Sequence, residues 1–193
     1  MRIAIALFVS ILLCACGGKE FLRPQSGAFT PGSTTYSQVV ATYGEPQRIA
    51  PAAFNSVPAR VASYTYAKAI PFTTQLSTKS MVLIFDGDVM VSYDYASSFE
   101  DDKGSTAIDD EKVKQVSKGD KKSKVLSLLG RPGGEAIFPI VTPRGASLLR
   151  YTSLETYRVP FLPTPRITRK AISFKFDVAD ELVDVSSFES KPE

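Results

Sequence analysis

The sequence predicts an α+β fold made of two tandem units, each a short helix or pair of helices followed by a three-stranded antiparallel meander. One observation is an internal repeat, in which five short segments of residues 34–100 recur in the same order 86 to 91 positions later. A second is that each copy changes from the apolar spacing of a helix to stretches with strand character. The chain of 193 residues is long enough to bury a core in this arrangement.

The repeat sets the predicted domain boundaries. Residues 34–46 and 120–132 both end in Gly-x-Pro, and the sequence Ser-Ser-Phe-Glu at 97–100 returns at 186–189. The three matches between them are Tyr64-Thr65 with Tyr151-Thr152, residues 70–72 with 159–161, and Phe85-Asp86 with Phe176-Asp177. Five collinear matches indicate duplication of one unit. We predict a first unit at residues 29–100, a linker at 101–112 and a second unit at 113–189.

The first unit begins with an amphipathic helix. Its apolar positions have the i, i+3, i+4, i+7 spacing of one helix face, and they are Tyr36, Val39, Val40 and Tyr43. Ser33 or Thr34 can cap the start of this helix. Gly44 can adopt the left-handed conformation of a helix end, and Pro46 cannot continue the helix. Strands are predicted at residues 60–67, 80–85 and 89–95, with a tight turn at residues 86–88.

The second unit repeats this order of elements. A short turn or helix is expected at residues 111–116, and a helix capped by Asp120 and ended by Gly130 follows it. Its apolar stripe comprises Val125, Leu128 and Leu129. Strands are predicted at residues 146–152, 171–176 and 182–185. The lysines around this helix form either one solvated face or a contact for anionic lipid or an acidic partner.

The amino terminus has the pattern of an export signal. Arg2 supplies a positive start, and the apolar run from Ile3 to Ala15 has 13 residues, fewer than the roughly 20 that a membrane-spanning helix needs. The Leu-x-Ala-Cys ending resembles the lipobox of bacterial lipoproteins, which implies a signal peptide at residues 1–15 and a diacylglycerol and acyl chain (palmitate or similar) on Cys16. The alternative is an ordinary secretory signal cut after Ala15, which would release a soluble periplasmic protein.

The segment after the signal predicts a location. Residues 16–28 contain glycine, proline, serine and charged residues with little apolar periodicity, so we expect a flexible tether. In enteric bacteria, an aspartate directly after the lipidated cysteine favours retention in the inner membrane. This chain has Gly17 at that position, so we predict that it lies at the outer membrane, facing the periplasm.

Composition excludes several classes of site. The chain has no histidine, and both of its cysteines lie in the signal region, so Cys/His zinc sites, cysteine nucleophiles and imidazole bases are excluded from the exported part. Without Arg2 the exported part has 22 basic and 20 acidic residues, which is no footprint for nucleic acid. We therefore expect no enzyme, no small-molecule substrate, no metal and no cofactor besides the lipid. A hydrolase using serine, lysine or carboxylates is a weaker alternative, and a cation site within residues 100–106 is weaker than a solvated linker there.

Two proline-bearing apolar loops are the candidate partner-binding sites. Ile70 and Phe72 lie in the first, and Val159 and Phe161 occupy the matching positions of the second. Such loops can present hydrophobic anchors to a partner protein. The competing interpretation is that each phenylalanine folds under its own sheet as core.

The helix ends and the sheets that follow them suggest a family. Gly32-Ser33-Thr34, the Val-x-x-x-x-Gly-x-Pro segments at 39–46 and 125–132, and the antiparallel strands after them resemble the SmpA/OmlA (BamE-like) family of small outer-membrane lipoproteins. Two such units in tandem resemble the β-lactamase inhibitory protein-like fold. The first resemblance implies a non-catalytic scaffold or assembly subunit of a cell-envelope protein complex, anchored in the membrane by lipid and acting through protein-protein contacts. The second implies an inhibitor of a periplasmic or secreted enzyme.

Overall fold

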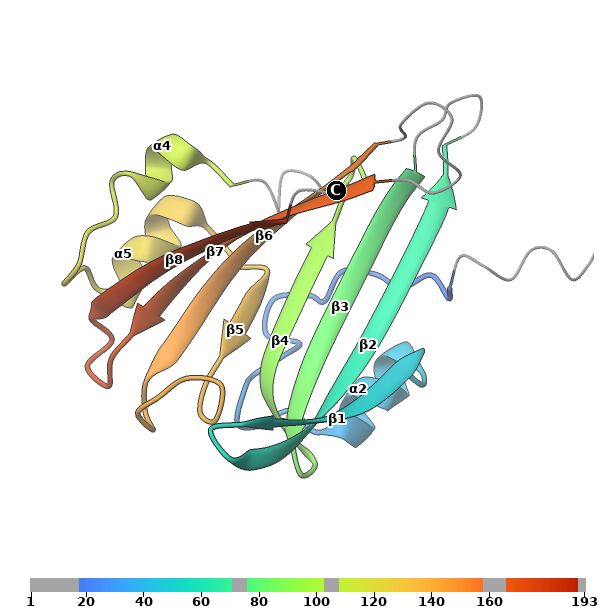
Figure 1. Cartoon of the computed structure of the whole chain (residues 1–193), viewed down its shortest axis with the longest axis horizontal. Helices are drawn as coiled ribbons and strands as arrows, with labels where there is room; N and C mark the ends of the chain where they lie inside the picture. Colours follow the sequence, from blue (N-terminus) through green and yellow to red (C-terminus); the bar gives the residue numbers. More distant parts are fainter. Residues whose placement is uncertain (1–17, 71–75, 103–107, 158–165, 191–193) are drawn as a thin grey trace, which may run out of the picture.

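The computed structural model describes residues 18–70, 76–102, 108–157 and 166–190, and it contains one eight-stranded antiparallel sheet (Figure 1). The strands lie side by side in chain order. They are β1 (Arg48–Phe54), β2 (Val57–Ala69), β3 (Leu76–Asp86), β4 (Val89–Ser97), β5 (Gly134–Ala136), β6 (Ser147–Tyr157), β7 (Arg166–Phe176) and β8 (Leu182–Ser190). The helices are α2 (Tyr36–Tyr43), α4 (Asp110–Val113) and α5 (Lys122–Leu129).

The predicted fold class is wrong, because the protein is mostly β and its two halves share one sheet. The short strand β5 pairs with β4 on one side and with β6 on the other, so the sheet continues from the first half into the second. The sequence analysis missed β1 and β5, since β1 contains Pro51 and β5 has only three residues and begins with Gly134. Joining the halves also pairs the edges of β4 and β6, which separate meanders would leave exposed.

The helix ends were predicted well and the helix starts were not. Thr35 caps α2 in a capping box with Gln38, one residue after the predicted position. At α5 the side chain of Asp120 accepts hydrogen bonds from Ser117 N and Lys124 Nζ, and Lys121 occupies the cap position without a side-chain hydrogen bond. Both predicted caps are therefore wrong. The predicted helix ends are confirmed, since positive-φ glycines follow both helices.

The same hydrogen bond holds each helix end to the sheet. Tyr64 Oη donates to the carbonyl of Gly44 at 2.8 Å, and Tyr151 Oη donates to the carbonyl of Gly130 at 2.8 Å. The register of the sheet also shifts at matching places, in the β3–β4 pair and in the β7–β8 pair. The repeated sequence thus has a repeated local structure, although the halves build a single sheet.

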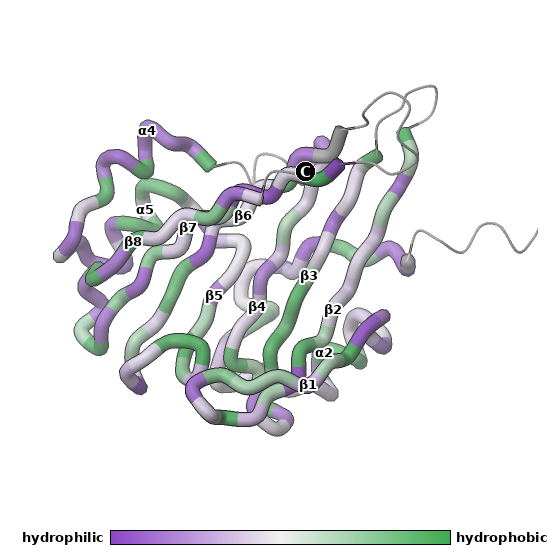
Figure 2. The backbone as a smooth tube through the Cα atoms, viewed as in Figure 1, coloured by the Kyte–Doolittle hydropathy of each residue, from purple (hydrophilic) through white to green (hydrophobic). Residues whose placement is uncertain are grey.

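Two hydrophobic clusters form the core on the face of the sheet that carries the helices. The first lies under α2 and contains Phe21, Phe29, Val39, Ala62, Tyr64, Met81, Leu83, Phe85, Met90, Tyr93 and Tyr95. The second lies under α5 and contains Val125, Leu149, Tyr151, Ile172, Phe174, Phe176 and Leu182. The most continuous hydrophobic stretch of the sheet is the second half of β3 (Figure 2).

Residues 18–35 cross behind β2, β3 and β4 in the view of Figure 1 and complete the first cluster. Phe21 is 6% exposed and meets the rings of Tyr64 and Tyr95 edge-on, at centroid distances of 6.1 and 6.3 Å. Arg131 fixes the same segment, since its Nη2 donates to the carbonyls of Pro24 at 2.7 Å and Gln25 at 2.8 Å. The described residues of the predicted tether, 18–28, therefore pack on the sheet.

The opposite face of the sheet is concave. Because β5 is so short, β4 and β6 approach each other directly beyond it, and Thr152 of β6 bonds to Asp94 of β4. Farther along, Leu154 of β6 and Ile167 of β7 line one cavity together with Thr65 of β2. The two halves of the sheet thus curve toward each other on this side, which the helices leave open.

Candidate functional site

The concave face is built from the alternate residues of the central strands that point away from the helices. The pairing register places the following side chains on it: Val61, Ser63, Ser80, Val82, Ile84, Ser92, Asp94, Ala96, Arg150, Thr152, Leu154, Arg169, Ala171, Ser173, Ser186 and Phe188. Most are short or apolar, and three charged ones stand together. Two further charged residues of this face, Lys175 and Asp184, pair across β7 and β8 in the row beyond Ser173 and Ser186. Asp94, Arg150 and Arg169 therefore define the polar centre of this face, which we call the Asp94 cluster together with Thr152.

Asp94 is a carboxylate held almost entirely inside the protein. Its side chain is 6% exposed, whereas those of Arg150 and Arg169 are 30% and 36% exposed. Arg169 Nη2 donates a hydrogen bond to Asp94 Oδ2, and Thr152 Oγ1 donates one to Asp94 Oδ1 at 3.0 Å. Arg150 Nη1 lies 3.8 Å from Asp94 Oδ2. A buried carboxylate needs such partners, since an unpaired buried charge would cost several kcal/mol.

Gly134 permits this cluster to form. It lies between Asp94 on β4 and Arg150 on β6 in one row across the sheet. A Cβ atom at position 134 would lie 2.5 Å from the backbone oxygen of Tyr93 and 3.1 Å from Asp94 Oδ1. Because glycine has no side chain, the carboxylate and the guanidinium can approach each other over the row. Gly134 is therefore required by the site, and it is also the residue that made β5 difficult to recognise in the sequence.

Two cavities adjoin the cluster, with Arg169 lining both. One has a volume of about 280 Å³ and is lined by Arg150, Arg169, Ala171, Ser173, Ser186, Ser187 and Phe188. The other has a volume of about 370 Å³, and its lining includes Gly18, Thr65, Leu154, Ile167 and Arg169. Phe188 is 60% exposed and Ile167 44% exposed, so apolar surface surrounds the charges. This combination is typical of a surface that another molecule covers.

The chemistry of the Asp94 cluster is that of binding. Each guanidinium has five N–H donors. Within the described residues, Asp94 accepts a hydrogen bond from Arg169 Nη2, and Ser173 Oγ accepts one from Arg150 Nε at 3.2 Å. The remaining donors lie beside a cavity. Two arginines and one aspartate leave one excess positive charge, which attracts an anionic group.

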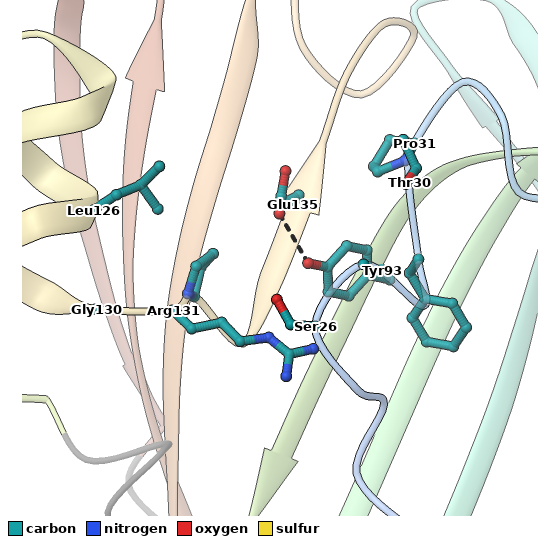
Figure 3. A pocket seen from close by; sticks show the side chains of 11 residues that line it. Ser26, Thr30, Pro31, Tyr93, Leu126, Gly130, Arg131 and Glu135 are labelled. Atoms are coloured by element: carbon teal, nitrogen blue, oxygen red, sulfur yellow. Dashed lines mark hydrogen bonds between the residues drawn. The ribbon is translucent and has the colours of Figure 1, made fainter.

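A third cavity, of about 470 Å³, lies on the helix-bearing face beside α5 (Figure 3). Three of its polar side chains already have partners: Tyr93 Oη donates to Glu135 Oε1 at 2.9 Å, and Arg131 Nη2 donates to the carbonyl of Pro24. Burial raises the pKa of the Tyr93 phenol, and the charge of Glu135 raises it further, so this phenol stays protonated at neutral pH. These groups therefore hold parts of the protein together, and we do not assign a binding function to this cavity.

The sequence-predicted binding residues fall mostly outside the described part of the chain. Cys16, Phe72, Val159 and Phe161 lie among the residues that the structure does not describe. Ile70 follows the last residue of β2 and is 37% exposed. The loop hypothesis and the lipidation of Cys16 therefore stay predictions.

Sequence analysis missed the Asp94 cluster altogether. One signal was present, because Asp94 lies between Tyr93 and Tyr95 in a strand that is otherwise apolar or small. A charged residue in such a strand points to a partner on a neighbouring strand. Its partners come from positions 56 and 75 residues later, and the sequence gives no direct sign of that distance.

The remaining sequence-predicted features are the candidate cation segment, the lysines near α5 and the membrane. Residues 103–106 of the cation segment lie outside the described residues, so that candidate stays untested. In the described ranges no group of three or more histidine, cysteine, aspartate or glutamate side chains could hold a metal ion. Three lysines near α5 have acidic partners close by: Lys114 with Glu111, Lys121 with Glu181, and Lys124 with Asp120. Among the residues that are described, no helix has the length and apolar character needed to cross a membrane.

Comparisons with known proteins do not assign this chain to a family. No protein-family model and no curated protein matches the sequence, so the SmpA/OmlA resemblance gains no support from them. The structure is similar to the crystal structure of a "putative beta-lactamase inhibitor protein" from Streptococcus mutans, with a TM-score of 0.43 and 13% identity over 80% of this chain and 82% of that chain. A similarity at this level transfers no function.

Proposed function

We propose that this chain is a non-catalytic binding protein that holds another protein of the cell envelope on the concave face of its sheet. One observation carries the proposal: helices and residues 18–35 cover one face, whereas the other face presents two partly exposed arginines and the exposed Phe188 beside cavities. A lipid on Cys16 would anchor the protein in the outer membrane, facing the periplasm. This part of the proposal rests on the signal pattern in the sequence.

The chemistry of the concave face supports binding over catalysis. Asp94 is committed to Arg169 and Thr152, so it is not a free general base. The described side chains that line the neighbouring cavity with Ser173 and Ser186 include no general base to activate these serines, because a guanidinium offers no hydrogen-bond acceptor. Exposed apolar area around a charged centre, in contrast, suits a protein-protein interface.

The experiment is affinity purification of the full-length protein, tagged at its carboxyl end, from gently solubilised envelopes. The key variant is Ser186→Trp, which puts a large side chain on the concave face at an exposed position. Its matched control is Ser127→Trp, at an exposed position of α5 on the other side of the sheet.

We expect wild type and the control to recover the same envelope protein in stoichiometric amount, and Ser186→Trp to lose it. Equal recovery by both variants would refute the concave face as the binding surface. Recovery of a soluble enzyme by wild type would replace the scaffold by an inhibitor, and the absence of any partner would count against a binding protein altogether. For the anchor, Cys16→Ala should leave an unprocessed or soluble form.

A further inference from the structure

We infer that Arg150 and Arg169 form a subsite for an acidic side chain, aspartate or glutamate, on a surface loop of the bound protein. The inference rests on the proposed function, whose partner chemistry it specifies. It follows from three features of the concave face: an excess of positive charge, two guanidinium groups that line a cavity, and apolar surface around them.

The excess charge is built into the fold. Asp94 neutralises one of the two arginines, and its burial fixes it in place at 6% exposure. Within the described residues, Asp94 is the acidic side chain that pairs with either arginine, and it carries a single negative charge. Asp184, another acidic residue of the concave face, lies opposite Lys175 in the register of β7 and β8. Partial burial reduces screening by water and salt, so this charge attracts an anion more strongly than a solvated lysine would.

The arginines are also held ready for a carboxylate. Arg169 is fixed by Asp94, and Arg150 is fixed through its Nε by Ser173 Oγ at 3.2 Å. These contacts restrict both side chains before any ligand binds, which lowers the entropy cost of binding. A planar guanidinium with free N–H groups matches the two oxygens of a carboxylate.

The surroundings favour a protein carboxylate over a free anion. The lining of the cavity of about 280 Å³ beside the arginines also includes Ala171 and Phe188, and Phe188 is 60% exposed. A small inorganic anion would leave this apolar surface in water. In a protein loop, an acidic residue can pair with the arginines while an aromatic or aliphatic neighbour covers the apolar surface.

The inference can be tested by titrating the full-length chain, in detergent micelles and labelled with ¹⁵N-arginine, with two peptides. The probe is acetyl-Gly-Ser-Phe-Glu-Ser-Gly-amide, and the control peptide has glutamine in place of glutamate. The readout is the Nε–Hε signals of Arg150 and Arg169, assigned with the variants Arg150→Gln and Arg169→Gln. Inorganic phosphate is titrated separately as a free anion.

We expect the glutamate peptide to shift both arginine signals in a saturable way and to bind roughly ten times more tightly than the glutamine peptide, as loss of a charge-assisted hydrogen bond predicts. Each arginine-to-glutamine variant should weaken binding roughly ten-fold. Lys175→Gln is the matched control, since Lys175 is a cation of β7 outside the cluster, and it should change affinity by less than about two-fold. Thermal unfolding of each variant checks that it is folded.

Three results would overturn the inference: no shift, equal affinity for both peptides, or phosphate binding as tightly as the glutamate peptide. The purification described above separates this failure from failure of the proposed function. If Arg150→Gln and Arg169→Gln recover the partner as well as wild type while Ser186→Trp loses it, the acidic subsite is wrong and the concave face still binds. If wild type recovers nothing, the proposed function fails, and the titration still decides whether the subsite accepts a carboxylate.

Discussion

Removing a single hydroxyl group at two matching tyrosines tests whether the repeated helix anchors stabilise the protein as the structure indicates. The variants are Tyr64→Phe and Tyr151→Phe, and each loses one hydrogen bond of 2.8 Å to the carbonyl of the glycine that ends a helix. A neutral hydrogen bond contributes about 0.5–1.5 kcal/mol to the free energy of unfolding. The two costs should differ, because Gly44 is partly buried whereas Gly130 is exposed.

We therefore expect Tyr64→Phe to lower the free energy of unfolding by about 1–1.5 kcal/mol, since the Gly44 carbonyl loses its partner where water reaches it less easily. Tyr151→Phe should cost only about 0.5 kcal/mol, because water can replace the hydroxyl at Gly130. Urea unfolding followed by circular dichroism measures both, and the double variant should be additive, as the sites belong to separate clusters. A larger cost for Tyr151→Phe than for Tyr64→Phe would refute this reasoning.

Three further predictions concern the sheet and its amino-terminal cover. Gly134→Ala should lower the free energy of unfolding by about 1–3 kcal/mol, because its Cβ would lie 2.5 Å from the Tyr93 oxygen, and hydrogen exchange in β5 should speed up measurably. Phe21→Ala should cost about 3 kcal/mol and expose residues 18–28 to limited proteolysis, because it removes a buried ring that is 6% exposed; unchanged protection would contradict this. Burial raises the pKa of Tyr64 to about 12. The folded state therefore binds this proton more tightly than the unfolded state. The contribution of the protonated phenol to the free energy of unfolding is fully present below pH 10 and is lost as the pH rises toward 12. If Tyr64→Phe and wild type lose stability identically at alkaline pH, this link is disproved.

Local elements could be predicted from the sequence because they depend on near neighbours. The stripe from Tyr36 to Tyr43 and the following Gly44 are enough to place α2 and its end, and the turn at Gly87 joins β3 and β4 as expected. The cap of α5 was predicted wrongly, since Asp120 is drawn into bonds with Ser117 and Lys124. Local sequence shows which residues can cap a helix, and competing partners decide which one does.

The single sheet and the Asp94 cluster could not be predicted, because both depend on contacts between the halves. A three-residue strand that begins with glycine has almost no propensity signal, yet β5 connects β4 to β6. The same contact brings Arg150 and Arg169 to Asp94. The sequence repeat indicated two similar units. It contained no information on how the strands pair where the two units meet.

Gly18 is the first described residue, and it lies against β2 at Thr65 and lines the larger of the two cavities of the concave face. Two residues of fully extended chain reach at most about 7 Å, so a lipid attached at Cys16 would leave almost no slack between the bilayer and this corner of the sheet. If Cys16 carries the proposed lipid, the folded part of the chain would stay close to the bilayer. The cavity that Gly18 lines would then lie near the lipid surface, and a partner embedded in the same bilayer would meet the concave face within a short distance of the membrane.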